Sequence, residues 1–350
     1  MLRKTWYAVC REGEIVARTT PHQVIVHGEP LVLWADSQGN VSVHPAACPH
    51  RGCDLGLGRV ESGELVCPFH GWRFDMEGRC VKVPANTVRQ PVPSGARLKL
   101  YPTVRKWGWV WVYTENGYST KVHGATVPSL LSFPEFEHKN WKYEWFEARW
   151  HAHFSRVVES VLDISHLPFV HPETTGQSVD PQVKGLSYQW EEANGQQSLR
   201  IYPRPFAPSH PLEPPVEWGR EPNPTEGRTE MQLMFPNQWI IRTPMGDGHW
   251  MCTYLTFTPE DMQTTRIYGT VIRNFDPSLD WLTQLHLEHT KFVMEQDRRI
   301  VESLRPLIAP FEIQKEFHVP SDAPGLRYRS MLKQEWMKEQ IATSEDERFS

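Results

Sequence analysis

Two short boxes between Cys48 and Trp72 contain side chains that could hold a metal centre. The first reads Cys48-Pro-His50-Arg-Gly-Cys, and the second reads Cys67-Pro-Phe-His70-Gly-Trp72. Each box offers one thiolate and one imidazole. Two sulfurs can bind one iron of a [2Fe-2S] cluster while two ring nitrogens bind the other iron. The sequence therefore predicts a cluster held by Cys48, His50, Cys67 and His70.

Both boxes are expected to lie at the tips of loops. Pro49 and Pro68 stiffen the chain beside the first cysteine of each box, and Gly52 and Gly71 permit tight turns. A zinc site is the alternative, because zinc also binds two cysteines with two histidines. Zinc fingers pair cysteine with cysteine and histidine with histidine at short spacing, whereas each box here pairs one of each. The spacing favours the cluster, and a coloured, reducible protein would exclude zinc.

A second group of polar residues follows about ninety positions later, at Glu159, Asp163, His166 and His171. On a helix the first three of these share one face, at i, i+4 and i+7. Pro168 blocks continuation of that helix, so the chain can turn and bring His171 beside His166. A histidine pair of this kind could bind a metal. The alternative is a buried polar stripe followed by a loop histidine.

A metal site with two histidines needs a carboxylate to complete the 2-His-1-carboxylate facial triad of non-haem iron. A helix expected over residues 278–304 supplies Asp297, which shares a side with Val293, Ile300 and Val301. A buried aspartate without a partner is costly, and a metal ion would remove that cost. Asp297 is therefore the predicted third ligand.

Other polar residues in the same regions are interpreted as packing or surface groups. Glu295 shares its helix face with basic residues and is expected to face solvent. His151 and His153 are placed on one face of a strand, and His286 and His289 form an i,i+3 pair on the late helix. No carboxylate accompanies His151 and His153 nearby, so these pairs are weaker metal candidates.

These motifs resemble those of Rieske non-haem iron oxygenases. The resemblance implies that His166, His171 and Asp297 bind Fe(II). It also implies that Asp163 hydrogen-bonds a ligand histidine and links it to the cluster of another subunit. Glu159 stands where many members have asparagine, and it is assigned to the surroundings of the iron. The segment that begins at His318 resembles the C-terminal segment of caffeine-type N-demethylases and of saxitoxin-tailoring monooxygenases, and the late helix resembles that of dicamba- and vanillate-type O-demethylases.

The resemblance implies a terminal oxygenase that uses O2 to hydroxylate or oxidatively demethylate a small organic substrate. No G-x-G-x-x-G motif follows a strand, so electrons are expected from a separate NAD(P)H-dependent reductase or a ferredoxin. Family members are commonly homotrimers in which a cluster serves the iron of the neighbour. A ring dioxygenase that forms cis-diols, and a Rieske electron-transfer protein without oxygen chemistry of its own, remain alternatives.

The elements that position these residues predict an α+β protein of two domains. Residues 1–118 are expected to form a small antiparallel β domain that presents the cluster loops. Residues 119–350 are expected to form a helix-grip-like catalytic domain with a single antiparallel sheet and flanking helices. Strands are expected at 231–235, 239–243, 250–258 and 265–272. Residues 174–227 contain many prolines and are interpreted as a loop or lid.

Composition narrows the class of partner and the compartment. The 350 residues are 39% hydrophobic with a formal net charge of −5, and lysine and arginine are scattered. Neither nucleic acid nor an anionic membrane is expected as a partner. A secretory signal and a long apolar run are both absent from the sequence, so a soluble, cytoplasmic protein is expected. Cys10, Cys53, Cys80 and Cys252 are interpreted as free thiols.

Overall fold

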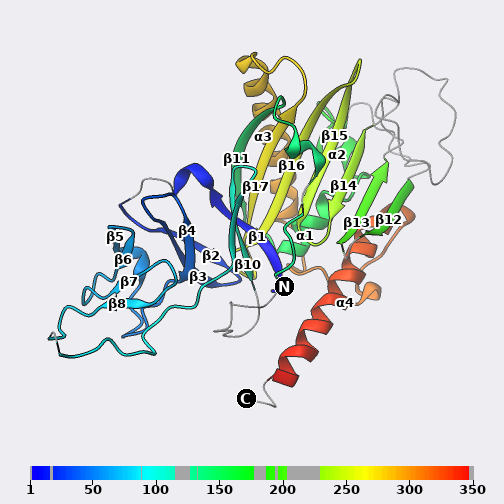
Figure 1. The fold of residues 1–350 in the computed structure, drawn as a ribbon. Helices are drawn as coiled ribbons and strands as arrows, with labels where there is room; N and C mark the ends of the chain where they lie inside the picture. The colour runs from blue at the N-terminus through cyan, green and yellow to red at the C-terminus, as the bar shows by residue number, and fades with distance from the viewer. Residues whose placement is uncertain are drawn as a thin grey trace, which may run out of the picture. The chain divides into compact units, whose positions relative to one another are not determined.

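The computed structural model describes residues 2–15, 19–87, 89–114, 127–131, 133–176, 187–193, 196–202 and 229–346. The chain divides into two compact units (Figure 1). The first comprises Met1–Leu130, Thr258–Met262 and Lys338–Ser350, and the second comprises Leu131–Phe257 and Gln263–Met337. The domain boundary predicted at 118/119 lies outside the described residues.

Small antiparallel sheets build the first unit. One sheet has the order β1-β10-β9, formed by Thr5–Arg11, Trp109–Thr114 and Thr103–Lys106. A second has the order β2-β3-β4, formed by His22–Val26, Glu29–Ala35 and Val41–Pro45. The third has the order β5-β6-β7-β8, formed by Arg59–Glu61, Glu64–Val66, Arg73–Phe74 and Cys80–Lys82. These sheets confirm the antiparallel β domain predicted for the N-terminal part.

The third sheet and its neighbours position the two cysteine boxes. The first box follows β4, and the second box connects β6 to β7. Beneath the boxes lies a cluster of buried side chains that includes Trp34, Leu55, Leu65 and Phe74, together with the two cysteines. Burial of this apolar surface holds the strand ends, and hence the loops, in place.

A single seven-stranded sheet forms the second unit, with the order β11-β17-β16-β15-β14-β13-β12. Its strands are Lys142–Trp150, Ser187–Ala193, Gln196–Tyr202, Glu230–Met234, Gln238–Gly246, His249–Pro259 and Thr265–Arg273, numbered β11 to β17 in chain order. The four late strands predicted from the sequence are confirmed as β14 to β17. The α+β class with one large antiparallel sheet is confirmed as well.

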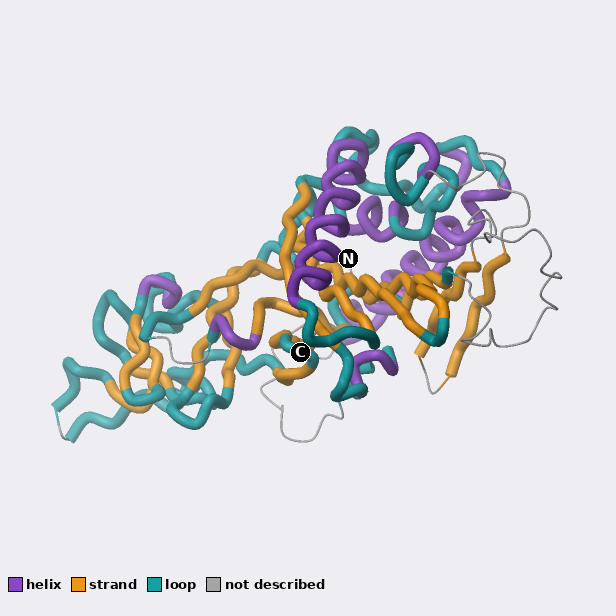
Figure 2. Tube along the Cα trace, turned by 90° about the horizontal axis from the view of Figure 1, so that it is seen from above, coloured by secondary structure: helices purple, strands orange, loops and turns teal. Residues whose placement is uncertain are grey.

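The helices are α1 at Phe154–Ser160, α2 at Leu167–Val170, α3 at Asp280–Val301 and α4 at Ala323–Asp346. Helix α3 packs on β11 and β17 and also contacts α1, and Figure 2 separates these helices from the strands by colour. Its buried side includes Leu287, Met294 and Val301. This packing brings the C-terminal half of α3 towards the segment that contains α1 and α2.

Three expectations about secondary structure are wrong. The helix expected to run from Glu159 to His166 ends at Ser160, and Pro168 lies in the first turn of α2 rather than at the end of a helix. Proline is well suited to a first turn, because that turn leaves backbone N–H groups unpaired anyway. His151 and His153 do not share a face of a strand, because β11 ends at Trp150.

The segment 174–227 is also not a loop throughout. It contains β12 and β13, and Leu199 and Ile201 of β13 belong to the core. Prolines are concentrated in the later part of the segment, whereas residues 196–202 alternate in the way that favours a strand. Residues 203–227, the proline-rich part of the expected loop or lid, lie outside the described residues.

Candidate functional site

The two cysteine boxes fold in the same way. In each, the carbonyl of the cysteine accepts a hydrogen bond from the glycine four positions later, at 2.8 Å for Cys48 and 3.0 Å for Cys67. The cysteine N–H donates to the carbonyl of the residue after that glycine, at 2.9 and 2.8 Å. Gly52 and Gly71 have φ values of +69° and +68°, a region that glycine adopts without strain. The glycine of each box is therefore required by the turn.

The side chains of the boxes converge. Cys48 and Cys67 are both buried, and the rings of His50 and His70 lie with their centroids 4.6 Å apart. Trp72 stacks on His50 at 4.5 Å with an interplanar angle of 7°. Nδ1 of His50 is buried and has no hydrogen-bond partner among the residues that the structure describes. The four predicted cluster ligands are thus brought to one place.

Electrostatics at the boxes fit a positively charged group. Burial, with a contribution from the neighbouring thiol of Cys67, raises the pKa of Cys48 to about 12. Two thiolates packed side by side would repel, and iron neutralises that charge. The donor set of two sulfurs and two imidazoles, including an unpaired ring nitrogen, therefore fits a [2Fe-2S] cluster.

In the second unit, the short helix α2 places two imidazoles at its two ends. His166 is the N-terminal cap residue and His171 is the C-terminal cap residue, and their ring centroids lie 5.3 Å apart. Asp297 reaches them from α3. Its Oδ1 lies 3.3 Å from Nε2 of His166 and 2.9 Å from Nε2 of His171. The donor atoms of all three residues lie within 4.8 Å of one another, as a shared metal ion requires.

His171 shows most directly that this group fits a metal. The side chain is fully buried, and its Nδ1 lies 2.9 Å from Oε1 of Gln296. An amide oxygen only accepts hydrogen bonds, so His171 carries its proton on Nδ1 and presents a lone pair at Nε2. Among the described residues, Nε2 has no hydrogen-bond partner although Oδ1 of Asp297 lies close by. The lone pairs of this nitrogen and of the carboxylate oxygen repel each other in a buried site. A cation between the two atoms removes the repulsion.

His166 lies between two carboxylates. Its Nδ1 is 3.5 Å from Oδ2 of Asp163, whose Oδ1 accepts hydrogen bonds from the backbone N–H and the hydroxyl of Ser165 at 2.7 and 2.6 Å. Burial alone would lower the pKa of His166, but Asp163 and Asp297 raise it to about 9. The pKa of Asp297 is lowered despite its burial, because the neighbouring His166 favours the charged form. The site as a whole favours positive charge at its centre.

Two family models match the chain. Residues 5–102 match the Rieske [2Fe-2S] domain, and residues 150–338, more than half of the chain, match the vanillate O-demethylase oxygenase C-terminal domain. The chain belongs to this oxygenase family. The resemblance to Rieske non-haem iron oxygenases is confirmed. A Rieske domain holds a [2Fe-2S] cluster, and an oxygenase domain of this family implies a mononuclear iron with an external reductase.

Individual relatives are distant. Aminopyrrolnitrin oxygenase PrnD of Pseudomonas fluorescens is 32% identical over 178 residues, which are 49% of this chain and 46% of PrnD. The toluene-4-sulfonate monooxygenase system iron-sulfur subunit TsaM1 of Comamonas testosteroni is 22% identical over 92% of this chain and 93% of TsaM1. The match to PrnD thus spans about half of that relative's length.

The fold is shared with a solved structure. The structure of NdmA from Pseudomonas putida CBB5 with caffeine has a TM-score of 0.76 and 23% identity, and the match covers 95% of this chain and 90% of NdmA. At this level of identity the likeness shows the fold alone.

Glu159 of the oxygenase domain does not contact the three converging residues. Its carboxylate accepts two hydrogen bonds from Arg329 of α4, both at 2.8 Å. Arg329 also donates to Glu316, which in turn pairs with Arg156 at 2.7 Å. Burial raises the pKa of Glu159, although Arg329 acts in the opposite direction. The contacts place Glu159 in a buried ionic network beside the site.

A pocket of about 350 Å³ adjoins both groups. Its lining includes Asp163, His166 and Asp297 on one side, and Glu159 and Arg329 on another. The oxygenase domain thus has an opening that reaches two of the three converging side chains.

The other histidines and acids considered from the sequence lie elsewhere. His153 caps the N-terminus of α1, His286 contacts the hydroxyl of Thr253, and the exposed Glu295 pairs with Arg298. Glu295 therefore faces solvent, as predicted. Gln296 contacts His171 from 125 positions away and is not among the residues predicted from the sequence. Its position next to Asp297 was the only available signal.

Proposed function

We propose that this chain is the terminal oxygenase component of a Rieske monooxygenase system, with Fe(II) held by His166, His171 and Asp297. The supporting observation is that two imidazoles and one carboxylate place their donor atoms within 4.8 Å of one another. When bound, such an iron offers open positions at which O2 can be activated beside a substrate. The reaction is hydroxylation, or oxidative demethylation, of a small organic molecule.

The chain's own residues prepare this site. Gln296 fixes the tautomer and orientation of His171, and Asp163 does the same for His166. Glu159 and Arg329 brace one wall of the adjoining pocket, which makes Glu159 a positioning residue. The substrate class includes the N-methyl, O-methyl and aromatic compounds on which oxygenases of this type act.

Turnover tests the proposal directly. The purified protein, with a generic reductase, is given a panel of N-methyl, O-methyl and aromatic compounds, and oxygenated or demethylated products are identified. Asp297→Ala should abolish turnover and release the mononuclear iron while leaving the visible spectrum of the cluster unchanged. Turnover that survives loss of this iron would show an electron-transfer protein instead, and cis-diol products would show a ring dioxygenase.

Electron delivery between subunits is part of the proposal. The cluster of one copy serves the iron of a neighbouring copy in a homotrimer, and Asp163 is the bridge. Two apolar side chains of the Rieske domain support this arrangement, since Leu57 is 73% and Phe69 is 61% exposed in the cluster-binding region. The exposed Phe317 on the lining of the pocket offers a complementary apolar surface.

Asp163→Asn tests the bridge. The variant should retain cluster and iron yet fail to pass electrons from a pre-reduced cluster to the iron site in a single turnover. Asp322→Asn, which also alters the lining of the pocket, is the matched control and should behave as wild type. Normal turnover of Asp163→Asn at full iron content would contradict this role.

Sedimentation at several protein concentrations measures the oligomeric state. The variant Phe69→Ser should form a weaker trimer than wild type.

The cytoplasm is the proposed location, with electrons supplied by an NAD(P)H-dependent reductase or a ferredoxin. None of the six cysteines, all in the described part of the chain, forms a disulfide, which suits a reducing compartment. Among the described helices, none combines the length and the apolar character needed to cross a bilayer. Fractionation of cells and reconstitution with candidate reductases are the corresponding measurements.

A further inference from the structure

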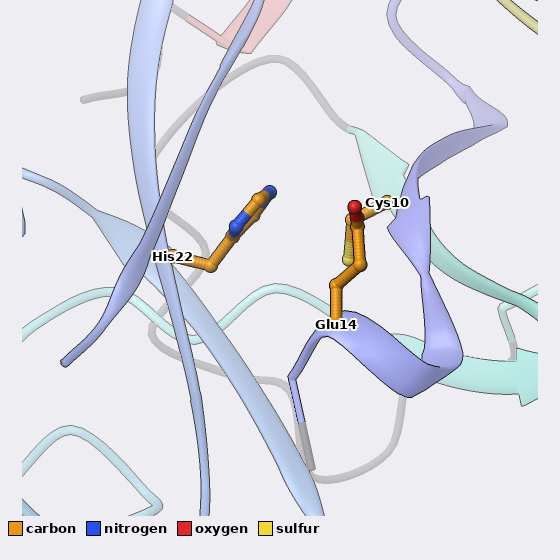
Figure 3. Close-up of side chains that lie close together, drawn as sticks. All are labelled: Cys10, Glu14 and His22. Atoms are coloured by element: carbon orange, nitrogen blue, oxygen red, sulfur yellow. The ribbon is translucent and has the colours of Figure 1, made fainter. Parts of the chain in front are cut away.

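A second group of possible metal ligands lies in the first unit, apart from the cluster loops. It consists of Cys10, Glu14 and His22, and one donor atom of each lies within 4.8 Å of the other two. Figure 3 shows the ring of His22 directed towards the carboxylate of Glu14 and the sulfur of Cys10. Neither the proposed oxygenase chemistry nor the family motifs use these residues.

Local structure explains why these side chains converge. The register between β1 and β10 shifts between Ala8 and Cys10, so Val9 is an extra residue in the strand. Without this bulge Ala8 and Cys10 would point to the same face, whereas the bulge turns Cys10 to the opposite one. Bulges are frequent where a strand must redirect a side chain for a site.

The other two ligands come from neighbouring elements. Glu14 lies in a short 3-10 helix, Glu12–Glu14, that directly follows β1. Its Oε2 accepts a hydrogen bond from the backbone N–H of Arg11 at 3.2 Å, which orients the carboxylate. His22 is the first residue of β2, where alternate residues are the more buried ones, and it belongs to the inward-facing set.

The ligand types indicate which ion fits. A thiolate, an imidazole and a carboxylate together suit zinc, which binds all three and is tetrahedral. In a tetrahedral zinc site the sulfur and nitrogen donors lie about 3.5 Å apart. Donors that already lie within 4.8 Å of one another can reach that geometry by side-chain rotation. Cys10 is only 1% exposed, so an ion bound to its sulfur would be largely shielded from water.

We propose that Cys10, Glu14 and His22 form a zinc site whose fourth position is taken by water. Binding of Zn²⁺ forms a Zn–S bond and breaks the S–H bond of Cys10, and the released proton goes to solvent. The ion joins β1, the 3-10 helix and β2, and so closes the chain segment between residues 10 and 22. No redox step is involved.

Zinc content of the holoprotein tests this proposal. Protein with its cluster and iron in place is equilibrated with ZnCl₂, dialysed against a moderately strong chelator, and analysed for zinc, iron and acid-labile sulfide. Wild type should retain one more zinc per chain than Glu14→Gln, Cys10→Ser or His22→Gln. Glu12→Gln is the matched control, because Glu12 lies in the same short helix and pairs with Arg105. It should retain zinc as wild type does.

Zinc bound at the cluster loops or at the iron site contributes equally to the zinc content of wild type and of every variant, because the residues of those sites are unchanged. Glu14→Gln keeps an amide oxygen that can accept the Arg11 N–H, so this variant should fold, and its cluster spectrum verifies that it does. Loss of a direct ligand should weaken zinc binding by more than the ~10- to 100-fold that loss of an outer partner causes. Equal zinc affinity in wild type and Glu14→Gln overturns the proposal, whatever the other variants do.

Discussion

Replacing Gln296 by alanine should weaken iron binding at the mononuclear site by about 10- to 100-fold. Gln296 is the partner of Nδ1 of His171, at 2.9 Å, and the imidazole is fully buried. Alanine leaves that N–H without an acceptor, which costs about 1–3 kcal/mol in a buried site. Since 1.4 kcal/mol is a factor of ten in affinity, this range corresponds to roughly 5- to 140-fold, which brackets the ~10- to 100-fold effect of losing an outer partner elsewhere.

The assay is competition between the protein and a chromophoric Fe(II) chelator under anaerobic conditions. The absorbance of the Rieske cluster serves as an internal reference, because Gln296 is not part of the cluster loops. Gln284→Ala is the matched control, since Gln284 lies on the exposed side of α3 and pairs with Glu288. Gln296→Glu retains an acceptor and should bind iron at least as tightly as wild type.

One result would refute this reasoning. If Gln296→Ala holds iron as tightly as Gln284→Ala, then the hydrogen bond does not set the tautomer of His171. The lone pair at Nε2, on which the fit to a metal depends, would then need another cause.

Three further predictions concern packing and acid stability. Gly269→Ala should lower the free energy of unfolding by about 1–3 kcal/mol, because a Cβ there would lie 2.1 Å from the ring of Phe146. Thermal unfolding measures this loss of stability. Gly176→Ala should lower the iron content with the cluster spectrum unchanged, because its Cβ would lie 1.9 Å from the carbonyl oxygen of Leu167 in α2. His286→Gln should reduce the loss of stability between pH 6.5 and 4, as measured by denaturant unfolding across that range.

The sign of the last effect follows from burial. Burial, with His289 and Arg273 acting in the same direction, lowers the pKa of His286 from 6.5 to about 4. The unfolded chain therefore binds the proton first, and the stability present above pH 6.5 is lost as the pH falls towards 4. A pKa shift of this size changes the free energy of unfolding by about 3 kcal/mol. An unchanged pH profile in His286→Gln contradicts the prediction, and the exposed His289 supplies the control His289→Gln.

The matching control for the glycine variants is Gly13→Ala. A Cβ at Gly13 has nothing within 4 Å, so stability should stay within experimental error of wild type. If Gly269→Ala proves equally neutral, Phe146 can move aside and the sheet is less tightly packed there than the contacts indicate.

The turn within each cysteine box could be predicted because it depends only on residues close together in the sequence. Each box is a closed turn of six residues with its own hydrogen bonds and glycine, so the sequence spacing already contains the geometry. The convergence of His166 and His171 was predicted correctly but for the wrong reason. A proline near the end of an apolar run is compatible with the end of one helix or with the start of another, and only the tertiary contacts of α2 decide between them.

Long-range partners were harder to predict. Asp297 was predicted as a ligand from the helical period, but the buried side of α3 was misjudged. Ile300, expected on the apolar face, is 49% exposed, whereas Thr283 and Thr290 are buried. Those threonines have polar partners on the sheet, since Arg273 donates to Thr283 and Thr253 contacts Thr290. Hydrophobicity alone cannot identify a helix face whose buried positions are paired polar groups.

The outer partners of the two histidines differ in a way that assigns them different tasks. His166 is held by the charged Asp163, which also lines the pocket, whereas His171 is held by the neutral Gln296 and is fully buried. The charged partner Asp163 raises the pKa of His166. A neutral partner in a buried position fixes His171 without adding a second negative charge beside Asp297. Exchanging the two partners would place a second negative charge beside Asp297 in the interior and leave His166 without the charged partner that raises its pKa.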